Sequence, residues 1–151
     1  MKLRFEQSVA APRERLFAFH CDPENMALLL RGWKGFELLA HDGHIRVGAR
    51  MRIRQAVGLL RQRITFEQFV FEPPVRFGER QVQGWFTRFE HVHEFSATAD
   101  ATTIVDRIEL TLPWYLGGAL AERWIVAPVL LRFFEFRRGA YQRLCESGRF
   151  R

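Results

Sequence analysis

The stretch TRFEHVHEFSATADATTIVDRIELTL, residues 87–112, alternates apolar or aromatic side chains with charged or polar ones over most of its length. Alternation with a period of two is typical of a β-strand that has one buried face and one solvent-exposed face. The short segment TADA interrupts the pattern. The stretch therefore predicts two antiparallel strands, Thr87–Ala97 and Thr103–Leu112, joined as a hairpin.

The same period of two continues upstream of this hairpin. It predicts five more strands, at Lys2–Val9, Phe36–Ala40, Ala49–Val57, Arg61–Glu72 and Val75–Gln83. Turn residues, among them Gly58, Pro73-Pro74 and Gly84, separate successive strands by hairpin-length connections. From Phe36 onward the strands are therefore expected to form an antiparallel meander.

Two short helices are expected between the first and second strands. Pro12 precedes RERLFAFH, and proline in the first turn is typical of a helix start. Asp22-Pro23 combines a capping residue with a first-turn proline. The pattern predicts helices over residues 12–20 and 22–30.

The period changes after Pro113. From about Leu116 to Glu146, apolar residues recur mostly in steps of three and four, which predicts one long amphipathic helix with a kink at Pro128. About thirty helical residues would span roughly 45 Å, enough to cross a seven-stranded sheet. The expected class is therefore α+β: a curved seven-stranded antiparallel sheet wrapped on a long C-terminal helix, with two short helices after the first strand.

Composition indicates one folded domain over residues 1–151. Of the 151 residues, 48% are hydrophobic and 26% charged, which is too apolar for a disordered chain. The longest apolar run, Trp124–Leu131, is far shorter than the roughly twenty residues that cross a bilayer. The N-terminal residues lack the apolar block of a secretory signal, and Cys21 and Cys145 form no disulfide or metal motif. We expect a cytoplasmic protein.

The chain is basic, with 23 Lys and Arg residues against 17 Asp and Glu residues, a formal net charge of +6. The arginines are interspersed with acidic residues, so no specific nucleic-acid partner is expected. A row of arginines on one strand face offers an alternative, in which the domain makes transient contact with an anionic membrane surface or RNA. This row comprises Arg50, Arg52 and Arg54, with Arg61 and Arg63 on the next strand.

The hairpin predicts one pair of polar residues inside the sheet. Alternation places Phe89, His91, His93 and Phe95 on one face, and Ile104, Asp106, Ile108 and Leu110 on the facing side of the next strand. A four-residue loop pairs residue 97 with residue 102, so antiparallel register pairs His93 with Asp106. Cβ atoms of such cross-strand neighbours lie about 4.5–5.5 Å apart, within reach of a hydrogen bond between the side chains.

This pair has two interpretations. His93 and Asp106 either form an acid–base couple or polar anchor for a ligand, or they form a buried pair that only fixes the hairpin. His91 faces the same way and offers a ligand another hydrogen bond. Two histidines and an aspartate also resemble three metal ligands, but this spacing is common in strands and no fourth ligand is evident, so no metal is expected. No nucleotide-binding glycine motif occurs, and no cofactor is expected.

Alternation also predicts which apolar side chains face the interior. Inward positions of the strands and one face of the long helix should line any cavity, and aromatic walls suit a flat or polycyclic ligand. The candidate ligand-binding residues besides the histidines and Asp106 are Gln55, Phe66, Gln68, Phe89, Trp124, Leu131 and Phe134.

Several segments resemble a known superfamily. They are IRVGARMRIR (residues 45–54, with Gly48), GWFTRFEHVHEF (84–95), TTIVDRIELTLP (102–113) and RFFEFRR (132–138). Together with the element order, they resemble the helix-grip fold of START-related lipid-transfer domains, the birch-pollen allergen family and bacterial polyketide cyclases, the SRPBCC superfamily, in a bacterial branch of unassigned members. The resemblance implies a deep cavity between sheet and helix that holds a hydrophobic small molecule.

Three functions follow as hypotheses. The first, which we favour, is binding or carriage of a hydrophobic small molecule or lipid without catalysis. The second is a cyclase, dehydratase or isomerase that uses acid–base chemistry in the same cavity, without metal or nucleotide. The third is the anionic-surface interaction module described above. The fold implied by the resemblance does not choose between carriers and enzymes.

Overall fold

The computed structural model describes residues 1–57 and 60–150. The turn expected at Gly58 lies outside the described residues. Within them the chain forms the strands β1 (Lys2–Val9), β2 (Phe36–His41), β3 (Arg50–Val57), β4 (Leu60–Glu72), β5 (Arg76–Gln83), β6 (Arg88–Ala97) and β7 (Thr102–Thr111). Two short helices, α1 (Arg13–His20) and α2 (Pro23–Leu29), follow β1, as predicted.

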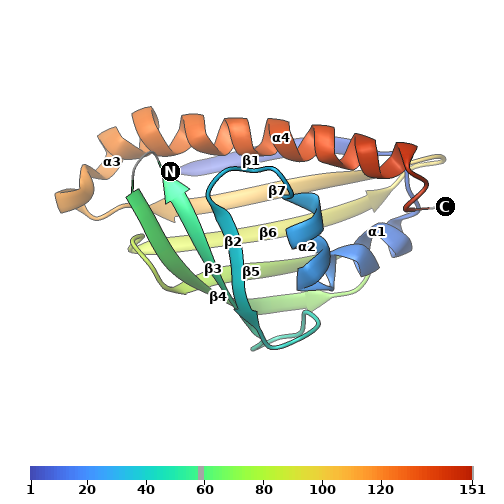
Figure 1. Ribbon diagram of the computed structural model, residues 1–151, viewed down its shortest axis with the longest axis horizontal. Helices are drawn as coiled ribbons and strands as arrows, with labels where there is room; N and C mark the ends of the chain where they lie inside the picture. The colour runs from blue at the N-terminus through green and yellow to red at the C-terminus, as the bar shows by residue number, and fades with distance from the viewer. Residues whose placement is uncertain (58–59, 151) are drawn as a thin grey trace.

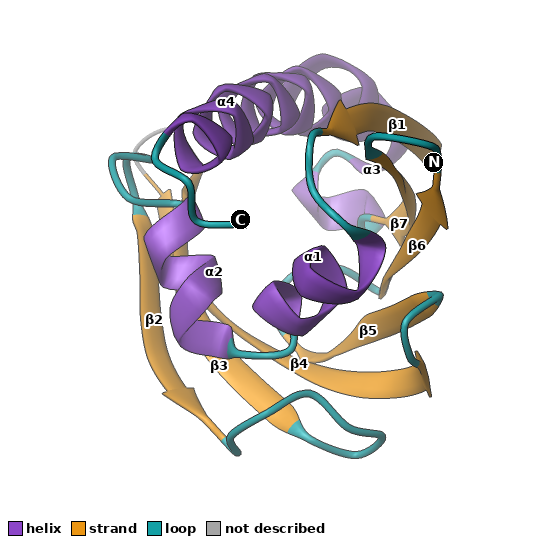
Figure 2. Cartoon of the chain, turned by 90° about the vertical axis from the view of Figure 1, so that its right-hand side faces the viewer, coloured by secondary structure: helices purple, strands orange, loops and turns teal. Residues whose placement is uncertain are grey.

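The strands form one antiparallel sheet in the order β1-β7-β6-β5-β4-β3-β2. The sheet curves around an interior, with the C-terminal helix across its concave side and α1 and α2 at one end (Figures 1 and 2). This is the helix-grip arrangement, so the predicted α+β class is confirmed. The predicted register is confirmed as well, because Ala97 pairs with Thr102 and His93 pairs with Asp106.

The C-terminal helix differs from the single helix predicted over residues 116–146. A 3₁₀ turn, η1 (Trp114–Leu116), and a left-handed Gly117 (φ 96°) come first, followed by α3 (Gly118–Ala121). A π-helical turn, η2 (Glu122–Val126), then joins α3 to α4 (Ala127–Glu146). The irregularity thus lies just before Pro128, whose ring would clash with a carbonyl of the preceding turn in a regular α-helix.

The packed core is concentrated where α1 and the last turns of α4 meet the sheet. Leu16 and Phe17 of α1 pack there with Phe95 of β6, Ile104 of β7 and Tyr141 of α4. Two smaller clusters face the rest of the interior, one built around Phe66 and the other around Ile108 and Phe134. Because the core is packed at one end, the remaining concave surface has room for a cavity. Among the described residues, no helix is both long and apolar enough to cross a membrane.

Candidate functional site

A cavity of about 200 Å³ lies between the concave face of the sheet, α2 and α4. Most of its wall is apolar, with side chains such as Met26, Ile53, Phe86, Ile108 and Leu130. A dry apolar cavity of about 150 Å³ is already large enough to bind benzene. The space therefore suits an apolar molecule larger than one aromatic ring.

The structure brings most of the predicted ligand-binding residues to this wall. Those that line the cavity are Gln55, Phe66, Gln68, Phe89, His91, His93 and Phe134. Asp106 is only 1% exposed and lies behind the two histidines, outside the wall. Contact of these residues with a ligand stays a prediction.

Trp124 and Leu131 do not line the cavity, so their assignment from the sequence was wrong. Their exposed fractions are 69% and 54%. Instead Val126, Val129 and Leu130 face the interior from the same helix. The π turn between residues 122 and 126 changes the helical phase, so extrapolating a 3.6-residue period placed Trp124 on the wrong face. For Leu131 the error is one residue: Leu130 faces the cavity, and Leu131 points about 100° away from it around the helix.

Asp106 is the centre of a buried polar cluster. Its Oδ1 atom accepts a hydrogen bond from Nε2 of His91 at 2.8 Å and one from Nη1 of Arg137 at 3.2 Å. Nδ1 of His93 lies 2.7 Å from the same oxygen, at an angle too poor for a regular hydrogen bond. The predicted His93–Asp106 contact is therefore present, but the better hydrogen bonds come from His91 and from α4.

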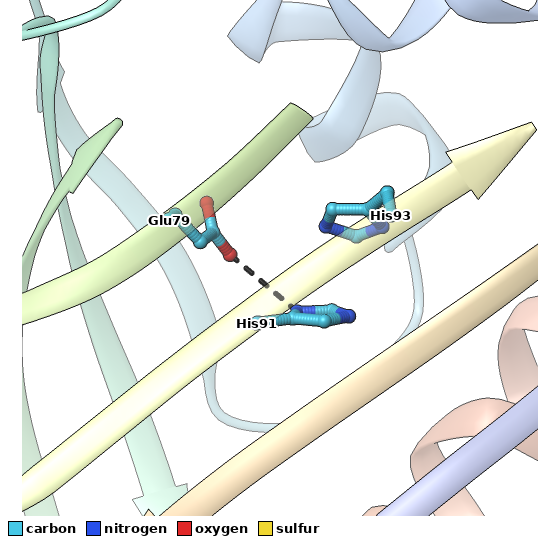
Figure 3. A group of neighbouring side chains, drawn as sticks. All are labelled: Glu79, His91 and His93. Carbon is cyan, nitrogen blue, oxygen red and sulfur yellow. Dashed lines mark ion pairs between the residues drawn. The ribbon is translucent and has the colours of Figure 1, made fainter. Parts of the chain in front are cut away.

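Two further groups extend the cluster in opposite directions. On one side, Oε1 of Glu79 on β5 lies 3.6 Å from Nδ1 of His91, and the three side chains Glu79, His91 and His93 converge at the cavity wall (Figure 3). On the other side, Arg137 Nη2 donates to the hydroxyl of Tyr141 at 3.1 Å, and this hydroxyl bonds His20 in turn. Arg137 and His20 also line the cavity, whereas Tyr141 belongs to the packed core.

Burial and neighbouring charges set the protonation of the cluster. Burial would raise the pKa of Asp106, but Arg137 and the histidines hold that pKa well below its ordinary value. Burial would lower the pKa of His91, yet hydrogen bonds to Asp106 and Glu79 raise it. Burial, with the charge of His91, lowers the pKa of His93 to about 4. These shifts favour ionised carboxylates at Asp106 and Glu79 and a neutral imidazole at His93 near neutral pH, and His91 keeps its proton to a higher pH than an ordinary histidine does.

Four members of the cluster were not identified from the sequence: Glu79, Arg137, Tyr141 and His20. The inward position of Glu79 could have been predicted, because Glu79 is two residues from the inward-facing Phe77 and pairs with His91. Arg137 carried another, since it is three residues beyond Phe134 on the apolar stripe of the helix. A charged residue within such a stripe needs a buried partner, and Asp106 is that partner.

At the wall the cluster offers a ligand both donors and acceptors. The carboxylate of Glu79 and the imidazole of His93 line the cavity, whereas Asp106 and Tyr141 do not. Neither Cys21 nor Cys145 lines it, so no thiol nucleophile reaches this space. The chemistry available is therefore hydrogen bonding, ion pairing, proton transfer through an imidazole, or metal ligation by His and Glu.

Comparison with known families gives a match over most of the chain. The sequence model of the family described as polyketide cyclase/dehydrase and lipid transport matches residues 9–130. This range includes the whole sheet from β2 to β7, both short helices and the start of α4. Comparison with curated proteins found no match.

Solved structures with the same fold come from several sources. TTHA0849 from Thermus thermophilus is 21% identical, with a TM-score of 0.74 over 97% of this chain and 99% of that one. A START superfamily protein from Mycobacterium smegmatis is 16% identical, with a TM-score of 0.70 over 95% and 98% of the two chains. DynU16, a protein of the dynemicin biosynthetic locus, is 22% identical, with a TM-score of 0.63 over 97% of this chain and 48% of that one. At these identities the likeness shows a shared fold.

Proposed function

Since the chain belongs to the polyketide cyclase/dehydrase and lipid transport family, we propose that it binds and carries a hydrophobic small molecule or lipid in the cavity between the sheet and α4. The observation that carries this proposal is the cavity itself, with an apolar wall and a volume of about 200 Å³. Burying apolar ligand surface there contributes roughly 25 cal/mol per Å². Binding therefore needs no covalent step.

The polar groups suggest what kind of ligand fits. Glu79 and His93 occur together on a wall that is otherwise mostly hydrophobic, with Gln68 beside Glu79 at 3.2 Å. A few convergent polar groups in an apolar pocket usually orient one polar part of a ligand. We therefore expect a largely apolar molecule with one hydroxyl, carbonyl or amine group directed at Glu79 and His93.

The alternative is an enzyme of the cyclase or dehydratase type. DynU16, one of the structures with this fold, belongs to a biosynthetic locus. Against this alternative, both ring nitrogens of His91 face carboxylates, and Asp106 does not reach the wall. The carboxylate and imidazoles that remain at the wall belong to Glu79, His93 and His20. Each of these groups has a lowered pKa, which makes it a weak base at neutral pH. Carriage requires fewer additional assumptions.

Mass spectrometry separates these two functions. Native mass spectra of freshly purified protein should show a non-covalent adduct, and extraction with organic solvent should release an apolar molecule. Carriage predicts that this molecule keeps its mass and its chromatographic retention on incubation with excess protein. A product of different mass or retention, formed by the native chain but not by a folded His93→Gln variant, would instead support the enzyme. Failure of all apolar compounds to bind would contradict both.

Contact with a membrane is a second candidate, favoured by one exposed apolar segment at an end of the molecule (Figure 1). Large side chains project there from η1, α3 and η2: Trp114, Tyr115, Leu116, Leu120, Trp124 and Ile125. The guanidinium of Arg123 lies over the ring of Trp124, 5.3 Å from its centre. Aromatic and aliphatic residues beside an arginine are typical of a segment that inserts into the membrane interface. Val126 follows Ile125 in the chain and lines the cavity. A lipid in contact with this segment would therefore lie close to the cavity.

The arginine row expected to meet an anionic surface is a weaker basis for this contact. Arg50 and Arg54 form ion pairs with Glu67 and Glu37 on neighbouring strands, so their charges are largely offset. Sedimentation with phosphatidylcholine vesicles, with and without phosphatidylserine, tests both surfaces. We expect Trp114→Ser/Trp124→Ser to abolish sedimentation and Arg52→Ser to leave it unchanged. If Arg52→Ser abolished sedimentation and the double tryptophan variant did not, the arginine row would be the surface that contacts the membrane.

A further inference from the structure

We propose that Glu79, His91 and His93 form a binding site for a divalent transition-metal ion at the cavity wall. Each of these residues offers one ligand atom, and the three atoms lie within 4.8 Å of one another (Figure 3). In a tetrahedral zinc site with bonds of about 2.0–2.2 Å, neighbouring donors are about 3.4 Å apart. The separation of 3.6 Å between Glu79 Oε1 and His91 Nδ1 is already close to this value.

Asp106 explains which nitrogens would bind the ion. It lies on the far side of both rings from the cavity, 2.8 Å from Nε2 of His91 and 2.7 Å from Nδ1 of His93. A carboxylate behind a ligating histidine fixes the tautomer and the ring orientation by accepting the other N–H. Here His91 Nε2 donates to Asp106, which leaves Nδ1 of His91 as one metal donor. The close contact of His93 Nδ1 with the same oxygen leaves Nε2 of His93 as the other.

The third donor and the charge balance fit the same arrangement. Nε2 of Gln68 donates to Oε2 of Glu79 at 3.2 Å, which orients this carboxylate and leaves its Oε1 atom toward His91. Arg137, which also lines the cavity, is held by Asp106 and Tyr141. It offsets the charge of Asp106, so Glu79 supplies the negative charge that a divalent cation favours.

This ligand set differs from the one considered in the sequence. The sequence pattern offers Asp106 as the third ligand and predicts no metal. In the structure the third ligand is Glu79, on a different strand, and Asp106 lies behind the histidines. Two imidazoles and one carboxylate suit Zn²⁺ or Fe²⁺, and three protein ligands leave coordination positions open toward the cavity. The proposal does not depend on lipid carriage, because it concerns the wall and not the occupant of the cavity.

Cobalt supplies a direct optical test. Protein stripped with a chelator and titrated with Co²⁺ should develop visible absorption that saturates at one ion per chain and is displaced by Zn²⁺. Mg²⁺, which prefers oxygen ligands, should not displace it. His93→Ala and Glu79→Gln should each weaken Co²⁺ binding at least a hundredfold. Asp106→Asn should weaken it about ten- to a hundredfold without changing the stoichiometry.

His41→Ala is the matched control, because His41 contacts Glu24 at 3.1 Å on the exposed surface and would account for adventitious binding. This variant should bind Co²⁺ as the native chain does. Circular dichroism establishes that each variant is folded. If His93→Ala does not fold, ¹⁵N spectra of the native imidazoles with Zn²⁺ should show the shifts at Nδ1 of His91 and Nε2 of His93. Absence of saturable binding, loss of binding in His41→Ala, or a folded His93→Ala that binds normally would overturn the proposal.

Discussion

The guanidinium of Arg137 on α4 lies 3.2 Å from the carboxylate of Asp106 on β7, measured from Nη1 to Oδ1, and the two residues are only 3% and 1% exposed. This contact joins the covering helix to β7, the strand next to the edge strand β1. A buried charge is tolerated when a partner offsets it, because ions are poorly stabilised in a medium of low dielectric constant. The contact also neutralises part of the charge behind the two histidines at the cavity wall.

Removing one member of this pair should destabilise the fold strongly. Arg137→Met keeps an unbranched stem and deletes the cation, leaving Asp106 without its cationic partner on α4. We expect the free energy of unfolding in urea to fall by about 3–5 kcal/mol. Arg138→Met, at an exposed position of the same helix, is the control and should change it by less than about 0.5 kcal/mol.

The double variant Arg137→Met/Asp106→Leu tests the coupling between the two charges. Because it removes both charges together, it should be more stable than the sum of the two single effects predicts. Strict additivity in this cycle would show that the two side chains do not stabilise one another.

Substitution of two adjacent residues of α4 by tryptophan should affect ligand affinity differently. Leu130 lines the cavity, whereas its neighbour Leu131 is 54% exposed and does not. Leu130→Trp should reduce the affinity for a fluorescent apolar probe at least tenfold, because the indole occupies part of the available volume. Leu131→Trp should bind the probe as the native chain does. Equal affinities in a fluorescence titration would place the bound probe elsewhere.

The hydroxyl of Tyr141 should ionise at a higher pH than that of an ordinary tyrosine. Burial raises the pKa of its hydroxyl to about 12, although Arg137 opposes the shift. An unfolded tyrosine ionises near pH 10, so the contribution of Tyr141 to stability is present below that pH and is lost as the pH rises toward 12. Absorbance at 295 nm should show a phenolate step near pH 12 that Tyr141→Phe removes. The step is informative only while circular dichroism shows a folded chain, and its occurrence near pH 10 in that chain would contradict the burial.

Cys21 should react slowly with thiol reagents. Burial raises the pKa of its thiol to about 11. Because the thiolate is the nucleophile, a rise of about two units leaves about a hundredfold less reactive form near pH 8. In a Cys145→Ser background, labelling with Ellman's reagent should be at least tenfold slower than for a short cysteine peptide, and urea should restore the peptide rate. Rapid labelling of the folded chain would show an activated thiol.

The hairpin was predictable because its pairing is local. Alternation assigns the faces, and the length of the connecting loop sets the register. His93 and Asp106 could therefore be paired from residues 87–112 alone. The long covering helix was predictable for a similar reason, since its apolar stripe repeats over many turns.

Helix faces near an irregular turn were less predictable. A π turn changes the helical phase by an amount that no short-range pattern reveals. Trp124, within that turn, consequently points to solvent, although its spacing matches the apolar stripe.

The sequence by itself determined the succession of elements, the inward positions on each strand and the single histidine–aspartate pair, because each depends on neighbours a few residues apart or on one short loop. Only the tertiary structure decided that Arg137 reaches Asp106. That contact depends on how α4 is rotated over the sheet. It is a property of packing between segments far apart in the chain, unlike the pairing of Glu79 with His91 on consecutive strands.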